Sequence, residues 1–222
     1  MKLTIFGATG GIGRQALEQA ITAGHDVTAV VRNPQKLRGI QARIATADLS
    51  DPDPAALYSA VSGAGAVVSG LGARSKADVG VAWRGTAAIT KAMQAAGVGR
   101  IVVVSAAPVG TVPSPGRPEP VKRDPSDGFM FRNVAFPILR WAFRDNYADL
   151  AQMEDVLRES DLDWTVIRPV RLTDKPLTGT YRTAYGQNVR HGLFISRADV
   201  AHCMLRVLDE PETIGQTVGI AN

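Results

Sequence analysis

The run GATGGIG near the start of the chain places three glycines three residues apart, at Gly7, Gly10 and Gly13. Gly7 allows a sharp turn, Gly10 lacks the Cβ that would hold a phosphate away from the backbone, and Gly13 lets a helix lie close to a sheet. N–H groups at the start of that helix would then face an anion. We therefore assign a dinucleotide pyrophosphate to the residues of this turn: Gly7, Thr9, Gly10, Gly11, Ile12 and Gly13. A plain strand–turn–helix is the alternative, but the position of the run between a strand and a helix favours the dinucleotide.

A basic residue follows the second expected strand, where sites for NAD usually carry Asp or Glu to bind the ribose 2′-hydroxyl. Here the chain reads Val31-Arg32-Asn33, with Lys36 one helical turn later. The guanidinium of Arg32 is suited to a 2′-phosphate. These residues predict NADP(H) rather than NAD(H), and the alternative is a solvated basic residue on a loop.

The ends of the other expected strands supply further candidates, because ligands of an open parallel sheet bind beyond the carboxyl ends of its strands. Asp48 is placed to accept a hydrogen bond from the adenine amine, although a carboxylate that caps a turn or helix would look the same. For the same reason we assign to the cofactor the residues Leu49, Gly70, Leu71, Gly72, Ser105, Ala106, Pro169, Val170 and Arg171.

The elements that position these residues alternate along the chain. Strands are expected at 2–6, 27–31, 42–45, 66–69, 100–104, 163–168 and 216–220, and helices at 12–21, 51–62, 79–96, 138–160 and 197–208. The order predicts a single-domain, Rossmann-like α/β fold over residues 1–222, with a doubly wound parallel sheet and a small C-terminal extension on the substrate side.

Smaller patterns refine this outline. Ser196 and Asp199 resemble a capping box that opens the last helix, and Glu154 with Arg158 forms an i,i+4 pair expected to be exposed. Residues 169–187 are expected to be loop and hairpin-like. The single cysteine, Cys203, excludes a disulfide framework and is expected in the core.

Composition excludes several classes of protein. The chain has 222 residues and a net charge of +4, without a compact basic cluster, so we expect no nucleic-acid partner. There is no signal-peptide pattern and no apolar run of about 20 residues, so we expect a cytoplasmic protein without membrane contact. The three histidines are scattered and predict no metal site. No helix face is apolar enough to require a partner, which suggests a monomer or a weak homo-oligomer.

A proline-rich segment interrupts the alternation between residues 106 and 137. We expect residues 109–136 to form a loop on the substrate side, since long irregular stretches inside compact domains are often functional. Its basic residues could meet an anionic group, and its aromatic residues, with one just beyond it, could stack on a flat ring. These residues are Lys122, Arg123, Phe129, Phe131, Phe136 and Trp141. A packed surface loop is the equal alternative.

The motifs together resemble the atypical short-chain dehydrogenase/reductase superfamily, in its NAD(P)H-binding, NmrA-like branch. The resemblance rests on the glycine run, Arg32, the run Val104-Ser105-Ala106 and Arg168-Pro169. The stretches 168–179 and 195–201 are similar to the biliverdin reductase B and flavin reductase group. This resemblance implies hydride transfer from NADPH to flavins or other planar redox-active rings, with Ser105 at the nicotinamide site, where it would bind cofactor or substrate. A strand-end serine that caps backbone groups is the alternative for Ser105.

The sequence departs from the superfamily in a motif that is needed for alcohol and ketone chemistry. Typical members use a Tyr-x-x-x-Lys pair as the acid and base of alcohol oxidation. None of Tyr58, Tyr147, Tyr181 and Tyr185 has a lysine four residues later. Reduction of a flavin or quinone does not need this pair, because it depends mainly on the position of the hydride donor relative to the acceptor and solvent can supply the proton.

We therefore expect an NADPH-dependent oxidoreductase of the flavin or quinone reductase type, acting on a small planar redox substrate. The main alternative is a non-catalytic, NADP(H)-sensing regulator of the NmrA-like kind. An isomerase or epimerase ranks last, since it needs the missing Tyr/Lys pair.

Overall fold

The computed structural model describes residues 1–73, 75–122, 124, 126 and 142–222. Eight strands form one sheet in the order β3-β2-β1-β4-β5-β6-β10-β8. They are β1 (Lys2–Phe6), β2 (Asp26–Val31), β3 (Arg43–Thr46), β4 (Ala66–Ser69), β5 (Arg100–Val104), β6 (Asp163–Pro169), β8 (Arg182–Tyr185) and β10 (Gln216–Ala221). The described α-helices are α1 (Gly11–Thr22), α2 (Pro54–Val61), α3 (Val81–Ala96), α5 (Arg144–Arg158) and α6 (Arg197–Arg206).

The sheet winds in two directions from β1. The chain passes from β1 to β2 and β3 on one side, and then crosses to β4, β5 and β6 on the other. All neighbouring pairs are parallel except β8 with β10. The Rossmann-like, doubly wound sheet predicted from the sequence is confirmed, and it places a topological switch point between β1 and β4, where such sheets bind ligands.

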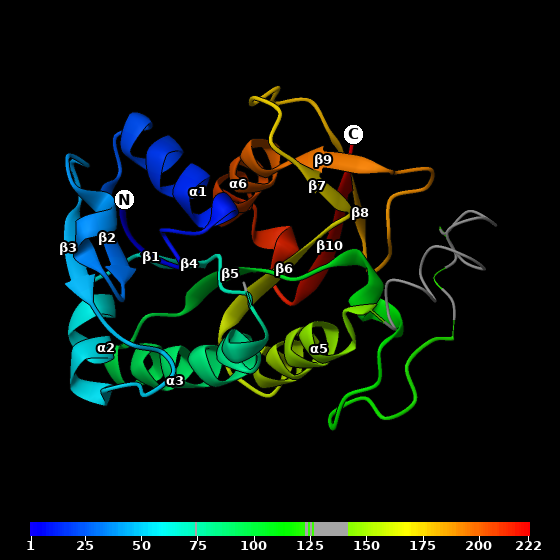
Figure 1. Cartoon of the computed structure of the whole chain (residues 1–222), viewed down its shortest axis with the longest axis horizontal. Helices are drawn as coiled ribbons and strands as arrows, with labels where there is room; N and C mark the ends of the chain where they lie inside the picture. Colours follow the sequence, from blue (N-terminus) through cyan, green and yellow to red (C-terminus); the bar gives the residue numbers. More distant parts are fainter. Residues whose placement is uncertain (74, 123, 125, 127–141) are drawn as a thin grey trace.

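Helices cover both faces of the sheet, and each face has its own core (Figure 1). Helices α1 and α6 lie on one face, and α2, α3 and α5 lie on the other. Successive side chains of β1 point to opposite faces of the sheet, so Leu3 and Ile5 belong to the first core and Phe6 belongs to the second. On α1, Ala16 and Leu17 face the sheet and are fully buried.

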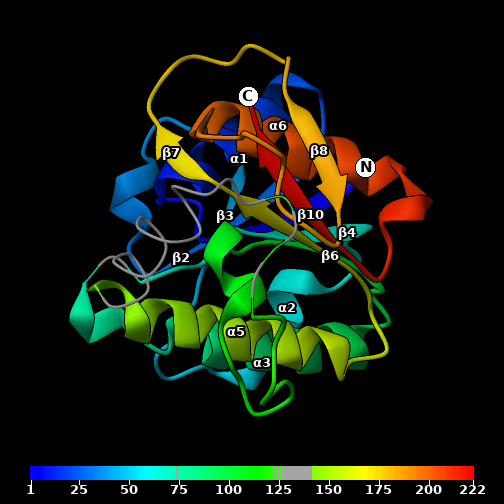
Figure 2. The same cartoon turned by 90° about the vertical axis from the view of Figure 1, so that its right-hand side faces the viewer.

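The C-terminal region differs from the expected hairpin. Strand β8 pairs antiparallel with the last strand, β10, at the sheet edge (Figure 2). A separate two-stranded sheet joins β7 (Arg171–Thr173) in parallel to β9 (Phe194–Ser196). The hairpin prediction was wrong because the partner strands come from farther along the chain, which local turn signals do not reveal.

Local caps explain where several elements begin. The Oγ of Ser196 accepts a hydrogen bond from the N–H of Asp199 at 2.9 Å, which confirms Ser196 as the N-cap of α6, and it donates one to Oδ2 of Asp199 at 2.7 Å. Gly80 adopts a φ of 94°, so α3 begins at Val81, after the short 3₁₀ helix η2 (Lys76–Asp78). Cys203 is fully buried, as expected.

Candidate functional site

The turn that joins β1 to α1 consists mostly of glycines and other small residues. Gly7 has a φ of 70°, a conformation that favours glycine, and its carbonyl accepts a hydrogen bond from the Gly10 N–H at 2.8 Å. Gly10 is the N-cap residue of α1, and no side chain caps this helix. The N–H groups of the first turn of α1 are therefore left for an external acceptor such as a phosphate.

Close backbone packing accounts for two of these glycines. A Cβ on Gly13 would overlap the carbonyl oxygen of Gly7, and a Cβ on Gly7 would lie 2.8 Å from the carbonyl carbon of Gly70. The first turn of α1, the end of β1 and the end of β4 therefore touch through their backbones. This contact keeps the N-terminus of α1 close to the ends of the central strands.

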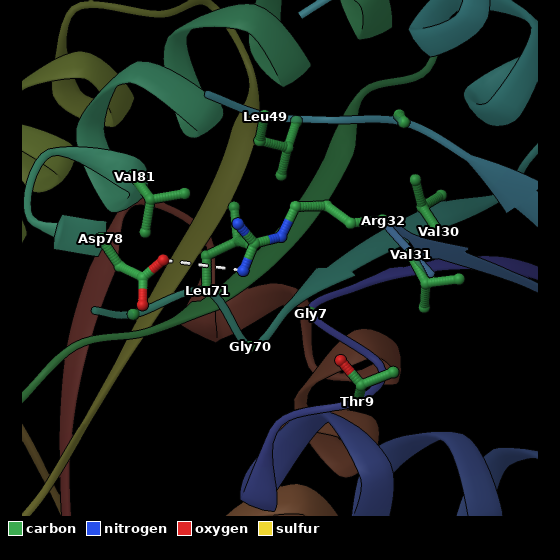
Figure 3. A pocket seen from close by; sticks show the side chains of 12 residues that line it. Gly7, Thr9, Val30, Val31, Arg32, Leu49, Gly70, Leu71, Asp78 and Val81 are labelled. Atoms are coloured by element: carbon green, nitrogen blue, oxygen red, sulfur yellow. Dashed lines mark ion pairs between the residues drawn. The ribbon is translucent and has the colours of Figure 1, made fainter. Parts of the chain in front are cut away.

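A pocket lies beside this turn, at the carboxyl ends of four neighbouring strands (Figure 3). Its lining contains seven of the residues predicted from the sequence, namely Gly7, Thr9, Arg32, Leu49, Gly70, Leu71 and Gly72. The structure adds five that the sequence did not single out: Val30, Val31, Ala47, Asp78 and Val81. The apolar walls suit a flat base such as adenine, and polar groups occupy its edge.

Arg32 extends across this pocket toward Asp78, as Figure 3 shows. Its Nη2 lies 3.6 Å from the Asp78 Oδ1, and the side chains are 59% and 22% exposed. Arg32 is the exposed member of this partly exposed pair, and pairs of this kind contribute little to stability. Asp78 comes from η2, far from Arg32 in the sequence, and no sequence signal linked the two.

Two other residues assigned to the adenosine end do not line the pocket. Asp48 is exposed, and its Oδ1 accepts hydrogen bonds from the N–H and the Oγ of Ser50 at 2.9 and 2.7 Å. These bonds, with a smaller contribution from Arg32, hold the pKa of Asp48 below its usual value. This geometry corresponds to the turn-capping alternative. Lys36 is exposed on the 3₁₀ helix η1 (Pro34–Leu37).

Ser105 lies at the end of β5 in a buried polar cluster. Its Oγ donates a hydrogen bond to the Oε1 of Glu154 at 2.8 Å, and its residue is 7% exposed. Arg168, at the end of β6, contacts both oxygens of that carboxylate at 2.9 and 2.5 Å. Since the serine proton is directed to Glu154, the remaining lone pairs of Oγ can only accept hydrogen bonds.

The expected exposure of the Glu154/Arg158 pair was wrong. The pair forms, with Nη2 of Arg158 2.6 Å from Oε2, but the Glu154 side chain is 0% exposed. Arg168 and Ser105 approach it from the sheet side, and this makes burial possible. Burial by itself raises the pKa of Glu154, but the two guanidinium groups outweigh it and hold the pKa below its usual value.

A second hollow adjoins the pocket through Gly72, which lines both. Its other lining residues are Ala73, Phe143, Asn146, Tyr147 and Leu150. The rings of Phe143 and Tyr147 are tilted by 58° with centroids 6.1 Å apart, and burial raises the pKa of the Tyr147 hydroxyl. The start of α5 thus supplies aromatic surface next to the first pocket.

The remaining assigned residues lie at the far strand ends, outside both linings. Ala106 is the N-cap residue of the 3₁₀ helix η3 (Ala107–Thr111). Pro169 ends β6, Val170 donates a weak backbone hydrogen bond to Ile220 at 3.4 Å, and Arg171 lies 5.5 Å from the ring centroid of Phe194.

Part of the proline-rich segment is described. The N–H of Gly116 donates to Oδ2 of Asp155 at 2.9 Å, so this part is held against α5. Lys122 is exposed. The other side chains expected to contact substrate fall outside the described residues: Arg123, Phe129, Phe131, Phe136 and Trp141.

Among the described residues, no group of three or more His, Cys, Asp or Glu could hold a metal ion. Within the same part of the chain, no helix is long and apolar enough to cross a membrane.

Comparison with known proteins agrees with this geometry. A family model described as NAD(P)H-binding matches residues 7–211. UPF0659 protein C216.03 of Schizosaccharomyces pombe is 28% identical over 91% of this chain and 83% of its own length. The uncharacterized sugar epimerase YhfK of Bacillus subtilis is also 28% identical, over 96% of this chain and 90% of its own.

Solved structures share the fold. A short-chain dehydrogenase/reductase from Veillonella parvula in complex with NADP has a TM-score of 0.74 and 20% identity, covering 100% of this chain and 94% of that one. ChuY, an anaerobillin reductase from Escherichia coli O157:H7, has a TM-score of 0.76 and 22% identity, with coverage of 100% and 97%. At 20% and 22% identity, these likenesses show the shared fold. The NAD(P)H-binding part of the resemblance is confirmed by the family model. With a match over most of its length, the chain belongs to the NAD(P)H-binding family.

Proposed function

We propose that this protein is an NADPH-dependent reductase that passes hydride from the nicotinamide to a planar acceptor such as a flavin or quinone. The observation that carries the proposal is that the dinucleotide pocket and the aromatic hollow are contiguous through Gly72. The pocket suits the adenosine half of the dinucleotide, and the nicotinamide would reach from it toward Ser105. A flat acceptor in the adjoining hollow would lie beside the cofactor, and hydride transfer requires that the two rings come into contact. NADP(H), when bound, supplies the hydride chemistry.

The residues that would hold the cofactor fit its parts. Leu49 and Val81 offer apolar surface to the adenine, and the N-terminus of α1 offers N–H groups to the pyrophosphate. Arg32 offers a guanidinium to the 2′-phosphate, which supports NADP(H) over NAD(H). Asp78 lies beside it and competes for the same guanidinium.

At the proposed nicotinamide end of the site, Ser105 would accept hydrogen bonds and would not act as a nucleophile. Its proton points to the buried carboxylate of Glu154, so an amide N–H of the nicotinamide or an N–H of the acceptor would suit its oxygen. The aromatic surface of Phe143 and Tyr147 would orient the flat ring, and solvent would deliver the proton that accompanies the hydride.

The NADP(H)-sensing regulator remains the second candidate, and one observation favours it. Tyr147 lies on α5, yet Ala151 occupies the position four residues later and is buried. The acid–base pair of the typical short-chain dehydrogenases is therefore missing from this helix. A protein that binds NADP(H) without turnover would have no need of it.

The test is NADPH consumption with FMN and with a simple quinone, with cofactor binding followed by nicotinamide fluorescence in the same samples. Turnover with either acceptor would support the reductase. Binding without turnover across several flat acceptors would overturn it in favour of the regulator. Absence of NADPH binding would overturn both.

A further inference from the structure

We propose that Arg197 is a further cofactor-binding residue, which exchanges the carboxylate of Asp174 for the pyrophosphate of the dinucleotide. This inference rests on the proposed binding of NADP(H). It concerns the first residue of α6, which the sequence marked only as part of a helix cap. Helix α6 lies beside α1 on the same face of the sheet (Figure 1).

The side chain of Arg197 lies against the start of α1. A Cβ built on Gly11 would be 2.6 Å from Cδ of Arg197 and 2.7 Å from its Nε. Gly11 is not one of the three spaced glycines of the turn, so the pyrophosphate argument leaves it unexplained. The structure supplies the reason: glycine at this position makes room for the arginine.

The helix packing that brings these residues together is specific. The Nε2 of Gln19 in α1 donates to the carbonyl of Ala198 in α6 at 2.9 Å. This bond links the two helices next to Arg197, so its place beside the glycine turn follows from buried packing and not from a loop.

The guanidinium of Arg197 lies near the N-termini of two helices, where a positive charge is electrostatically unfavourable unless an anion lies beside it. The positive end of a helix macrodipole disfavours nearby cations. Arg197 is the first residue of α6 and also contacts the first residue of α1, and α1 has no acidic residue in its first turn. A pyrophosphate at the start of α1 would bring a negative charge to a place that has a guanidinium and unused N–H groups.

The present partner of Arg197 is suited to exchange. Its Nη1 lies 2.5 Å from Oδ1 of Asp174, but the Asp174 side chain is 88% exposed and that of Arg197 is 32% exposed. Ion pairs open to solvent are weak, so a multivalent phosphate would compete well with a single carboxylate.

Release of Asp174 would not loosen the loop that carries it. The N–H groups of Thr178 and Gly179 both donate to Oδ1 of the buried Asp199, each at 2.9 Å. Asp199 therefore anchors this loop to α6 independently of Arg197. Substitution of Asp174 consequently tests the exchange without removing the anchor.

The test measures dissociation constants by calorimetry for NADP⁺ and for adenosine 2′-monophosphate, which lacks the pyrophosphate. R197Q should weaken NADP⁺ by about tenfold through loss of a charge-assisted contact and should leave the monophosphate unchanged. D174N should tighten NADP⁺ by about two- to fivefold by removing the competing carboxylate. R43Q is the matched control and should change neither constant. Nη2 of Arg43 lies 3.7 Å from Oδ2 of Asp26 in an exposed ion pair, and Arg43 does not line the pocket.

The outcomes separate this inference from the proposed function. If wild-type protein binds both ligands and R197Q binds NADP⁺ as tightly as wild type, the role of Arg197 is wrong while NADP(H) binding stands. Equal weakening of both ligands would mean that Arg197 only supports the fold, and it would also overturn the role. If R197Q does not fold, unchanged or weaker NADP⁺ binding by D174N overturns the exchange. Failure of wild-type protein to bind either ligand overturns the proposed function and this inference together.

Discussion

At the scale of single residues, the proposed preference for NADP(H) rests on Arg32, whose guanidinium contacts Asp78. The sequence indicated the guanidinium, but the structure shows a carboxylate 3.6 Å away that competes for it. If a 2′-phosphate binds Arg32 as proposed, it would compete with this carboxylate. A preference for NADPH over NADH should therefore depend on both residues and in opposite directions.

Two substitutions test this preference. R32E should weaken NADPH by about one to two orders of magnitude, because it replaces a charge-assisted contact with repulsion, and should affect NADH much less. D78N should strengthen NADPH modestly. Fluorescence titration of both cofactors measures the effects, with R43E as a charge-matched control. Equal effects of R32E on NADPH and NADH would contradict the assignment of Arg32 to the 2′-phosphate.

At the scale of elements, the start of α3 depends on a residue from another helix. Oδ2 of Asp149 in α5 accepts hydrogen bonds from the N–H groups of Gly80 and Ala82 at 2.8 and 3.3 Å, and Oδ1 accepts one from Trp83 at 2.8 Å. One buried carboxylate thus supplies the cap that the helix lacks in its own sequence. Since Val81 lines the pocket, this contact also positions one of its walls.

Removal of this cap should cost more than removal of a local one. D149A should lower the free energy of unfolding by about 2–3 kcal/mol, because buried N–H groups lose their acceptor. The control is D53A, which removes the exposed cap of α2, a bond of 2.9 Å to the Ala55 N–H, and should cost about 1 kcal/mol. Urea denaturation measures both. A loss in D149A no larger than that in D53A would disprove the structural role of the buried carboxylate.

At the scale of the whole molecule, the cluster around Glu154 joins α5 to the carboxyl ends of β5 and β6. Ser105 and Arg168 contact Glu154 from the two strands, and Arg158 contacts it from the helix. Because the pKa of Glu154 is lower in the folded protein than its usual value of 4.5, its contribution to stability is fully present above that value. The contribution is lost as the pH falls through the lowered pKa.

The free energy of unfolding should therefore fall as the pH drops from about 5 to 3. E154Q should reduce this dependence, and at pH 7 it should destabilise the protein by about 3–5 kcal/mol, since Arg168 is left buried without a counter-charge. Urea denaturation at several pH values measures both effects. The pKa values of Asp48 and Asp199 are also lowered in the folded protein, so the free energy of unfolding of E154Q should still fall in part at acid pH. An unchanged acid dependence in E154Q would contradict the assignment to Glu154.

The sequence by itself determined the doubly wound sheet, the glycine turn and the basic residue after the second strand. These features depend on local periodicity and on neighbours within one βαβ unit, so the pattern of residues carries them. Seven of the predicted cofactor residues do line one pocket for this reason, since strand ends in a parallel sheet meet at one edge.

Only the tertiary structure decided which side chains from distant segments meet. Glu154 fits the pattern of an exposed helical pair, and its burial depends on Arg168 approaching from the sheet. Asp78 and Arg197 likewise acquire their roles from elements that pack beside the glycine turn and the second strand. Periodicity predicts which face of an element is apolar, but it does not identify the residue opposite. The energy of a charged side chain depends on that opposite residue and on the water excluded between them.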